Sequence, residues 1–229
     1  MPRAWSYSSM SLFQQCPKKY YHLKVAKDVI DPPSVQMRYG LDAHKAAEDY
    51  VREGAALPAH FAFMKEPLDR LRQMEGEHLC EHRMGLDEDM EPCKFFDKAV
   101  WWRGIADLLV INGEKASLID YKSGKNTYPD TKQLELLSLA VFKHFPEVQT
   151  VKAGLLFVVH PALVKERFEA TEQIERWKKW HEQSMQLDEA YENGVWNPKQ
   201  NFTCKGWCPV LSCEHNGKEI GRASCRERV

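Results

Sequence analysis

Three charged residues interrupt an otherwise apolar stretch, RGIADLLVINGEKASLIDYKSGK, at residues 103–125. Asp107, Asp120 and Lys122 stand where a buried strand would carry valine or leucine. Burying two carboxylates and an ammonium costs several kcal/mol unless the charges pair with one another or bind a cation. The stretch therefore predicts a buried ion pair, charges exposed at the end of a sheet, or a site for a metal ion.

The NG dipeptide at residues 112–113 predicts a tight turn between two strands. A two-residue loop would place Asp107 opposite Leu118, and a four-residue loop would place it opposite Asp120. Because side chains alternate along a strand with period two, both registers put Asp107, Asp120 and Lys122 on one face of the sheet. An intermediate register would separate them.

Helices and a further strand are predicted around this hairpin from apolar periodicity and capping residues. The order is helices, a strand hairpin, then helix, strand and helix, which is typical of a mixed α/β layer fold. The expected helices cover residues 8–25 (with Ser8, Ser9 or Ser11 as cap and Pro17 as an interruption), 35–54, 58–74, 130–145 (capped by Asp130) and 170–194; strands are expected within 78–121 and at 151–160.

Composition limits the class of protein. A chain of 229 residues with 43% hydrophobic content can bury one substantial core, so a single domain is expected over residues 1–218. The net charge of -1 excludes nucleic-acid binding by bulk basicity but leaves room for a local positive groove. No apolar run reaches the roughly 18 residues of a membrane span, and the N-terminus lacks a signal peptide, so we expect a cytoplasmic protein without membrane contact.

The last residues, EIGRASCRERV at 219–229, resemble the in-frame translation of a common sequencing adapter. We expect this tail to be non-native, and Cys225 then has no functional meaning.

Three cysteines lie within ten residues near the C-terminus, and a fourth lies far upstream. They are Cys204, Cys208, Cys213 and, in FQQCPKKYY, Cys16. In a reducing compartment clustered cysteines more often hold metal than form disulfides, so this group predicts a metal centre. One possibility is a structural zinc ion, with His215 as a spare ligand. Cys80 and Cys93 have no partner at ligand spacing and are expected to be ordinary thiols.

An ordered set of residues runs through the chain: Gly40-x3-His44-x3-Glu48, Gly104-x2-Asp107, Asp120-x-Lys122 and then Gln133. This set resembles the RecB-like branch of the PD-(D/E)xK nuclease superfamily. The resemblance implies a restriction-endonuclease-like mixed β-sheet flanked by helices. It also implies hydrolysis of phosphodiester bonds with Mg²⁺ or Mn²⁺, ions that carboxylate ligands favour.

The same resemblance assigns roles to these positions. His44, Asp107 and Asp120 would bind the metal, and Lys122 would orient the attacking water or stabilise the charged phosphate. Glu48 would be a nearby catalytic acid, and Gln133 would hold the substrate or the lysine. The branch often has a tyrosine four residues after that glutamine, where this chain has Leu137.

The cysteines resemble those of the same branch, including the CRISPR-associated four-cysteine exonucleases, in which one N-terminal and three C-terminal cysteines bind a [4Fe-4S] cluster. Here three and four residues separate the C-terminal cysteines, where two and five are commoner. The resemblance implies a cluster that closes the C-terminus onto the first helix, with Zn²⁺ as the alternative.

Together these features predict a metal-dependent deoxyribonuclease, an exonuclease acting on single-stranded DNA or DNA ends in phage or bacterial recombination, repair or replication, with any protein partner unknown. Lys18, Lys19 and Tyr20 could guide phosphates and stack on bases, or could instead form a solvated face with a core aromatic anchor. The alternatives are a noncatalytic, metal-stapled DNA-binding protein and a structural zinc protein.

Overall fold

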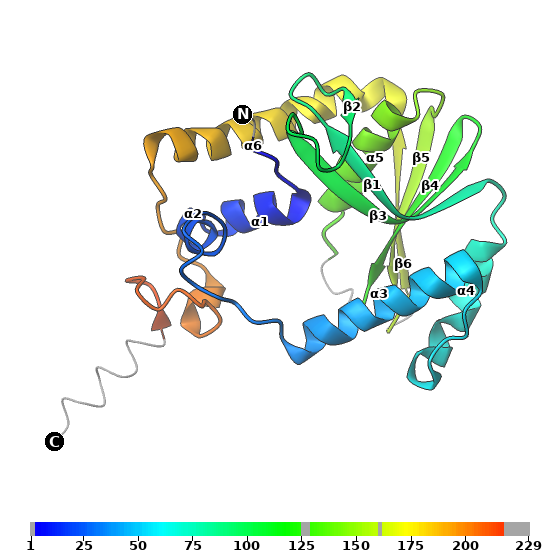
Figure 1. Ribbon diagram of the computed structural model, residues 1–229, viewed down its shortest axis with the longest axis horizontal. Helices are drawn as coiled ribbons and strands as arrows, with labels where there is room; N and C mark the ends of the chain where they lie inside the picture. Colours follow the sequence, from blue (N-terminus) through cyan, green and yellow to red (C-terminus); the bar gives the residue numbers. More distant parts are fainter. Residues whose placement is uncertain (1–2, 125–128, 160–161, 218–229) are drawn as a thin grey trace. The chain divides into compact units, whose positions relative to one another are not determined.

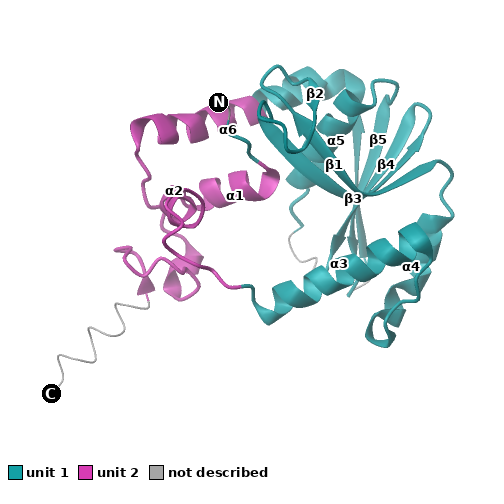
Figure 2. Ribbon diagram, in the orientation of Figure 1, with its two compact units in different colours: residues 1–5, 33–179 teal, residues 6–32, 180–229 magenta. Residues whose placement is uncertain are grey.

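The computed structural model describes residues 3–124, 129–159 and 162–217. The adapter-like tail at 219–229 lies outside these residues. The chain forms two compact units, one of residues 1–5 and 33–179 and the other of residues 6–32 and 180–229 (Figure 2). The stretch 1–218, expected to be a single domain, therefore contains parts of two units, and each is described by itself.

A six-stranded mixed sheet forms the centre of the first unit (Figure 1). Its spatial order is β2-β1-β3-β4-β5-β6, and β4 and β5 are its parallel pair. A parallel pair needs a crossover, which α5 supplies. The predicted mixed α/β class is confirmed. The strands are β1 (Glu77–Leu86), β2 (Pro92–Cys93), β3 (Trp102–Asn112), β4 (Lys115–Lys122), β5 (Thr150–Phe157) and β6 (Ala162–Glu169).

Helices flank this sheet. They are α3 (Val35–Glu53), the 3-10 helix η2 (Ala59–Met64), α4 (Lys65–Arg72), α5 (Lys132–His144), the 3-10 helix η3 (Ala170–Glu172) and the start of α6 (Gln173–Asn193). Ser34 caps α3 by accepting a hydrogen bond from the Met37 backbone N–H, and the helix ends at Gly54, whose φ of 74° is left-handed. The long helix that positions His44 and Glu48 thus has a defined start and end.

The core lies on both faces of the sheet. On one face α3, η2 and α4 contribute Ala43, Ala47, Phe61 and Leu68, which pack with Leu108, Ile119 and Tyr121 of the strands. On β5 the alternate residues Val151, Leu155 and Phe157 are also buried, so the opposite face is covered as well, and α5 contacts this strand. The sheet that carries Asp107 and Asp120 is therefore held rigidly from both sides.

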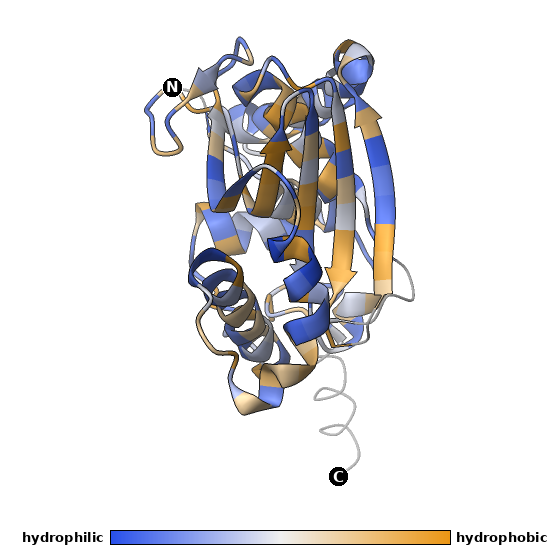
Figure 3. Ribbon diagram, turned by 90° about the vertical axis from the view of Figure 1, so that its right-hand side faces the viewer, coloured by the Kyte–Doolittle hydropathy of each residue, from blue (hydrophilic) through white to orange (hydrophobic). Residues whose placement is uncertain are grey.

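The sequence did not predict β6. This strand pairs antiparallel with β5 at the edge of the sheet, and it carries the run Lys165, Glu166 and Arg167, all exposed. Figure 3 shows the long hydrophilic section of this edge strand. A run of three charged residues hides the period-two pattern, and charges are common on strands that have one free edge.

The second unit contains short elements. These are α1 (Tyr7–Gln15), α2 (Pro17–Tyr20), the π-helix η1 (Tyr21–Val25), the rest of α6 and the 3-10 helix η4 (Phe202–Lys205). Pro17 does interrupt the first helix, as expected. The predicted cap is wrong, because Ser6 rather than Ser8, Ser9 or Ser11 caps α1 and forms a reciprocal capping box with Ser9.

Candidate active site

The β3–β4 hairpin brings Asp107 toward Asp120. Its register pairs Ile111 with Ala116 and ends with the pair Leu108 and Ile119, so it corresponds to the four-residue alternative. The turn lies at Gly113 and Glu114 rather than at the NG dipeptide, because Asn112 still pairs with Lys115.

Beyond the pair of Leu108 and Ile119, the backbone pairing of β3 with β4 ends, and the Asp107 side chain bonds to β4 instead. Its Oδ2 accepts a hydrogen bond of 2.7 Å from the Tyr121 backbone N–H. The carboxylate is thus fixed at the point where the β3–β4 pairing ends.

Asp120 is 3% exposed, and its Oδ2 lies 2.6 Å from the Nζ of Lys122. That Oδ2 has no hydrogen bond of suitable geometry in the described part of the chain, so the contact is an ion pair. Burial and then the negative charge of Asp107 raise the pKa of Asp120 to about 6, although Lys122 lowers it. The ion pair that the sequence offered as one alternative is present, but the pKa of Asp120 stays strongly raised despite it.

Gln133 lies in the first turn of α5 and accepts a hydrogen bond of 3.0 Å from Lys122 through its Oε1. The N-cap of this helix is Thr131 rather than Asp130, although Asp130 accepts a hydrogen bond of 3.1 Å from the Lys132 backbone N–H. The start of α5 thereby sets the position of the Lys122 ammonium.

His44 of α3 lies 3.3 Å from Asp107, measured from Nδ1 to Oδ2. Burial disfavours the charged ring, but the hydrogen bond to Asp107 and the charges of Asp107 and Asp120 outweigh burial and raise the pKa of His44. Gly40 lets the helix approach, since a Cβ there would lie 2.8 Å from the Ser123 hydroxyl. The two residues of the G-x3-H pattern therefore have different roles: Gly40 allows the close approach to Ser123, and His44 contacts Asp107.

Glu48 is less directly placed. Its carboxylate pairs with Arg52 one helical turn later and lies 3.5 Å from Lys45. Arg52 also donates a 2.8 Å hydrogen bond to the Cys80 carbonyl, which ties α3 to β1. Glu48 thus lies close to the acidic side chains of the site, but its charge is compensated by Lys45 and Arg52 of the same helix.

Leu137, the departure from the RecB-like pattern, is 3% exposed. A Cβ on Gly104 would lie 2.9 Å from its side chain, so Leu137 fills the space that this glycine leaves. It packs against the strand and offers no polar group to a substrate.

Sequence reasoning missed Glu81 on β1. Its carboxyl is near enough to Asp107, Glu48 and His44 for their charges to affect its pKa. The usable signal was its place in a strand opposite the Asp107 strand, but the pairing of two strands separated by a long loop was not predicted.

The side chains of His44, Asp107 and Asp120 are chemically suited to a hard divalent cation. They offer carboxylate oxygens and one imidazole, and they include a buried carboxylate oxygen that lacks a hydrogen bond. As the side chains stand in the described residues, no three His, Cys, Asp or Glu groups are close enough together to hold a metal ion. Binding would therefore require Asp107 or Asp120 to turn from its present partner.

In the second unit, the four predicted cysteines line one cavity. Cys16 comes from the junction of α1 and α2, and Cys204, Cys208 and Cys213 come from η4 and the loop after it. The Cys16 sulfur accepts hydrogen bonds from the backbone N–H groups of Lys19 at 3.5 Å and Lys199 at 3.4 Å.

Buried Asn216 holds the cysteine loop. Its side-chain amide donates to the carbonyl groups of Cys208 at 3.1 Å and Val210 at 2.8 Å. Four thiols separated by almost the whole chain thus line one cavity, but as they stand in the described residues no three of them are close enough together to hold a metal ion. Cys80 and Cys93 belong to the first unit.

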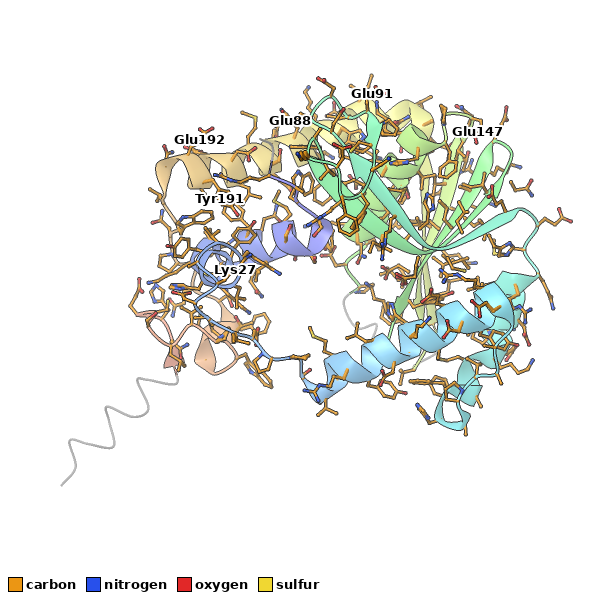
Figure 4. All side chains as sticks on the ribbon, viewed as in Figure 1. Lys27, Glu88, Glu91, Glu147, Tyr191 and Glu192 are labelled. Carbon is orange, nitrogen blue, oxygen red and sulfur yellow. The ribbon has the colours of Figure 1, made fainter. Side chains whose placement is uncertain are left out.

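The three residues considered for substrate contact differ in placement. Lys18 and Lys19 line the cysteine cavity, and Lys18 forms a 2.7 Å ion pair with Glu214. Tyr20 is 6% exposed; its ring stacks on Trp196, and its hydroxyl lies 3.2 Å from that of Tyr191, labelled in Figure 4. Tyr20 is therefore packed inside its unit.

A mixed sheet with a parallel β4–β5 pair, covered by helices and carrying two aspartates and a lysine at one end, defines a restriction-endonuclease-like fold. The sequence matches the PD-(D/E)XK nuclease superfamily over residues 4–213, a range that includes both units, and the chain belongs to this superfamily. It is accordingly a nuclease by family.

One solved structure supports the fold. The protein called SSO0001 is 11% identical, with a TM-score of 0.50, and the similarity covers 94% of this chain and 88% of that one. An exonuclease candidate from Eubacterium rectale is 14% identical, with a TM-score of 0.48 and coverage of 92% and 87%. A search of curated proteins found no match. None of the described helices is long and apolar enough to cross a membrane.

Proposed function

We propose that the protein is a Mg²⁺- or Mn²⁺-dependent deoxyribonuclease whose active site is the acidic end of β3 and β4. The observation that carries this proposal is the convergence of His44 with Asp107 at 3.3 Å and of Lys122 with Asp120 at 2.6 Å. A buried aspartate with a strongly raised pKa beside a lysine is a typical functional-site feature. Because the chain belongs to a nuclease family, the reaction that we propose for this site is the hydrolysis of a phosphodiester bond.

His44, Asp107 and Asp120 would hold the ion. When bound, the ion supplies charge relief on the phosphate and a more acidic water. Hydrolysis joins the oxygen of water to phosphorus and breaks the bond from phosphorus to the leaving sugar oxygen. Lys122 offers an ammonium to the negative charge that develops on the phosphate oxygens, and Gln133 holds that ammonium in place.

The substrate is proposed as single-stranded DNA or DNA ends, processed as an exonuclease in bacterial or phage recombination, repair or replication. This preference rests on the resemblance of the motifs. Lys18 and Lys19 remain proposed phosphate contacts, whereas buried Tyr20 is left out of the substrate surface.

For the second unit we propose a metal centre held by Cys16, Cys204, Cys208 and Cys213. Its support is that these four thiols line one cavity and that two backbone N–H groups already point at the Cys16 sulfur. A [4Fe-4S] cluster matches the four-thiolate requirement, and Zn²⁺ is the alternative ligand of the same set. Anaerobic purification distinguishes them, since a cluster absorbs near roughly 400 nm and zinc does not.

The nuclease proposal is tested with end-labelled linear and circular DNA, single- and double-stranded, incubated with Mn²⁺. Wild type is compared with Asp120→Ala and Lys122→Ala. We expect loss of linear single strands with wild type and intact DNA with both variants. The exonuclease assignment also requires circular DNA to persist.

Degradation that continues unchanged in both variants would eliminate this site as the catalyst. DNA binding without any cleavage by wild type would favour the noncatalytic DNA-binding alternative. A protein that holds zinc and neither binds nor cleaves DNA would be the structural zinc protein.

A further inference from the structure

A groove with a volume of about 530 Å³ opens on the first unit near the end of α4. Leu71 of α4 and Met74 just after it line the groove together with residues of β4, β5 and β6, and most of the lining is apolar. Gly154 leaves the floor without a side chain, since a Cβ there would lie 2.9 Å from the side chain of Leu163. The apolar floor is open to solvent next to the edge strand, where Leu163 is 45% exposed.

Positively charged side chains stand on the same face as this floor. Lys152 of β5 and Lys165 of β6 line the groove, both are exposed, and neither forms an ion pair within the described residues. Lys152 pairs with Arg167 across the two strands, and side chains alternate, so Lys152, Lys165 and Arg167 share one face. Glu166 alternates with them and belongs to the other face, and Glu169 compensates the charge of Arg167 at 2.5 Å. The groove thus combines an apolar floor with two uncompensated lysines.

The strand β6 is also the last strand of the sheet in the described part of the chain. Figure 3 shows this strand passing from hydrophobic to hydrophilic residues. The outer N–H and C=O groups of an edge strand can pair with a strand from another chain. A second copy of this chain fits poorly, because antiparallel pairing of two β6 strands about Glu166 would place Lys165 directly opposite the other copy's Arg167, and like charges at such positions are destabilising.

The groove differs in position and lining from a path for the DNA substrate. Its β4 residues, Ser117 and Ile119, alternate along the strand with Asp120 and therefore point to the opposite face of the sheet. Among the described residues that line it none is aromatic, so bases would find no ring on which to stack. An aliphatic floor beside lysines fits a peptide that carries both apolar and acidic side chains.

We propose that this groove binds an extended, acidic segment of a partner protein, which adds a strand to β6. The proposal does not depend on the nuclease activity. In an added strand every second side chain lies on the groove face. The side chain beside Leu163 is apolar, and those beside Lys165 and Arg167 are acidic, because opposite charges on neighbouring strands stabilise the pairing. The segment therefore carries one apolar and two acidic residues at alternate positions.

The test measures the binding of synthetic peptides to the full chain by fluorescence anisotropy. Two peptides carry the pattern in either direction, Thr-Leu-Thr-Asp-Thr-Asp-Thr and its reverse, because a strand can be added parallel or antiparallel. Two further peptides have lysine in place of both aspartates. The proteins are wild type, Lys165→Glu and the control Lys98→Glu, which changes an exposed lysine in the loop after β2, the strand at the other edge of the sheet.

We expect an acidic peptide to bind wild type and Lys98→Glu equally and Lys165→Glu about 10-fold more weakly. The lysine peptide should show the reverse preference and bind Lys165→Glu more tightly than wild type. This exchange of charge separates recognition from damage to the fold, since a misfolded variant would bind neither peptide. Hydrogen exchange of the β6 amides should also slow in wild type when the acidic peptide is bound.

Four results would overturn the proposal. The first is that neither acidic peptide binds wild type, and the second is that Lys165→Glu binds it as wild type does. The third is that the peptide leaves hydrogen exchange in β6 unchanged, which would place it elsewhere. The fourth is a different occupant: Lys165→Glu loses affinity for single-stranded DNA in chelator while no peptide binds, or it dissociates a wild-type dimer that gel filtration detects.

Discussion

The acidic end of the sheet and the cysteine cavity are built in opposite ways. Asp107 and Asp120 stand on paired strands whose register is set by five residue pairs, with helices packed on both faces. The cysteines stand on a helix junction, a four-residue 3-10 helix and a loop. In the first region the backbone ladder fixes the geometry of the side chains, and in the second it does not.

This difference predicts different responses to loss of metal. A site carried by a sheet keeps its shape when the ion leaves, because hydrogen bonds and core packing are independent of it. A site carried by loops depends on ligation, since the binding energy of a structural metal is folding energy. Changes in the acidic site should therefore alter chemistry, and changes in the cysteine cavity should alter stability.

The largest effect is expected from Lys122→Met. Methionine keeps much of the length of the side chain but removes the ammonium that lies near Asp120 and Gln133. Loss of one group that stabilises developing charge typically costs about 100- to 1000-fold in rate, equivalent to about 3–4 kcal/mol. Single-turnover cleavage of labelled single-stranded DNA measures this, with Mn²⁺ uptake measured in parallel.

The matched control is Lys115→Met, at the exposed start of the same strand. It should cleave at the wild-type rate. Equal losses in both lysine variants would mean that β4 itself had been disturbed, and the proposed division between chemistry and stability would not hold for this strand.

The second largest effect is expected from Cys204→Ser. Serine is close in size but is a poor ligand for iron or zinc, so bound metal should be lost. We expect the melting temperature to fall by on the order of 10 °C, corresponding to about 3 kcal/mol. Hydrogen exchange of the full chain should accelerate in residues 6–32 and 198–217 and stay unchanged in β3 and β4.

Cys93→Ser is the control, because Cys93 is a half-buried thiol of the first unit. It should retain metal and melt near the wild-type temperature. If Cys204→Ser kept its metal and its stability, the four-cysteine centre would be rejected. The cavity would then be lined by reduced thiols that bind no metal.

The hairpin and its charges were predictable because their information is local. The turn dipeptide predicted the hairpin, and period-two alternation put Asp107, Asp120 and Lys122 on one face in two of its three possible registers. The choice between them was not local. It follows from Asn112 pairing with Lys115, so the turn moved by one residue.

Glu81 and β6 were not predictable for a related reason. The relevance of Glu81 depends on β1 pairing with β3 across a long connection, which no local pattern reveals. The strand β6 is hidden by charges that only an edge position explains. The cysteine group was found because ligand residue types are rare, although the sequence does not give the distances between the thiols.

A smaller effect concerns stability of the metal-free protein against pH. The pKa of Asp120 is about 6 when folded and near 3.9 when unfolded, so the folded state binds more protons between these values. Stability from this group is present at pH 4 and is lost as pH rises through about 6, by about 2 kcal/mol. Protonated His44, whose pKa is also raised, contributes with the same sign at higher pH.

Asp120→Asn should therefore flatten the profile and stabilise the metal-free protein at pH 7, while removing activity. Urea unfolding in chelator between pH 4 and 8 provides the measurement, with exposed Asp89→Asn as control. A wild-type profile that rises steadily from pH 4 to 7 would show that Asp120 is not held in a costly ionised state.

The smallest effect, about 10-fold in rate, is expected from Gln133→Ala, which removes the acceptor 3.0 Å from the Lys122 ammonium. Sequence reasoning left two roles for this glutamine, holding the lysine or holding the substrate. If it holds the lysine, kcat falls, KM is unchanged, and Gln133→Glu restores the rate because a carboxylate also accepts the hydrogen bond. If it holds the substrate, KM rises and glutamate fails to rescue, since its charge repels phosphate. Lys122 still has Asp120 as a partner at 2.6 Å in either case, which is why this loss should stay well below that of removing the lysine itself.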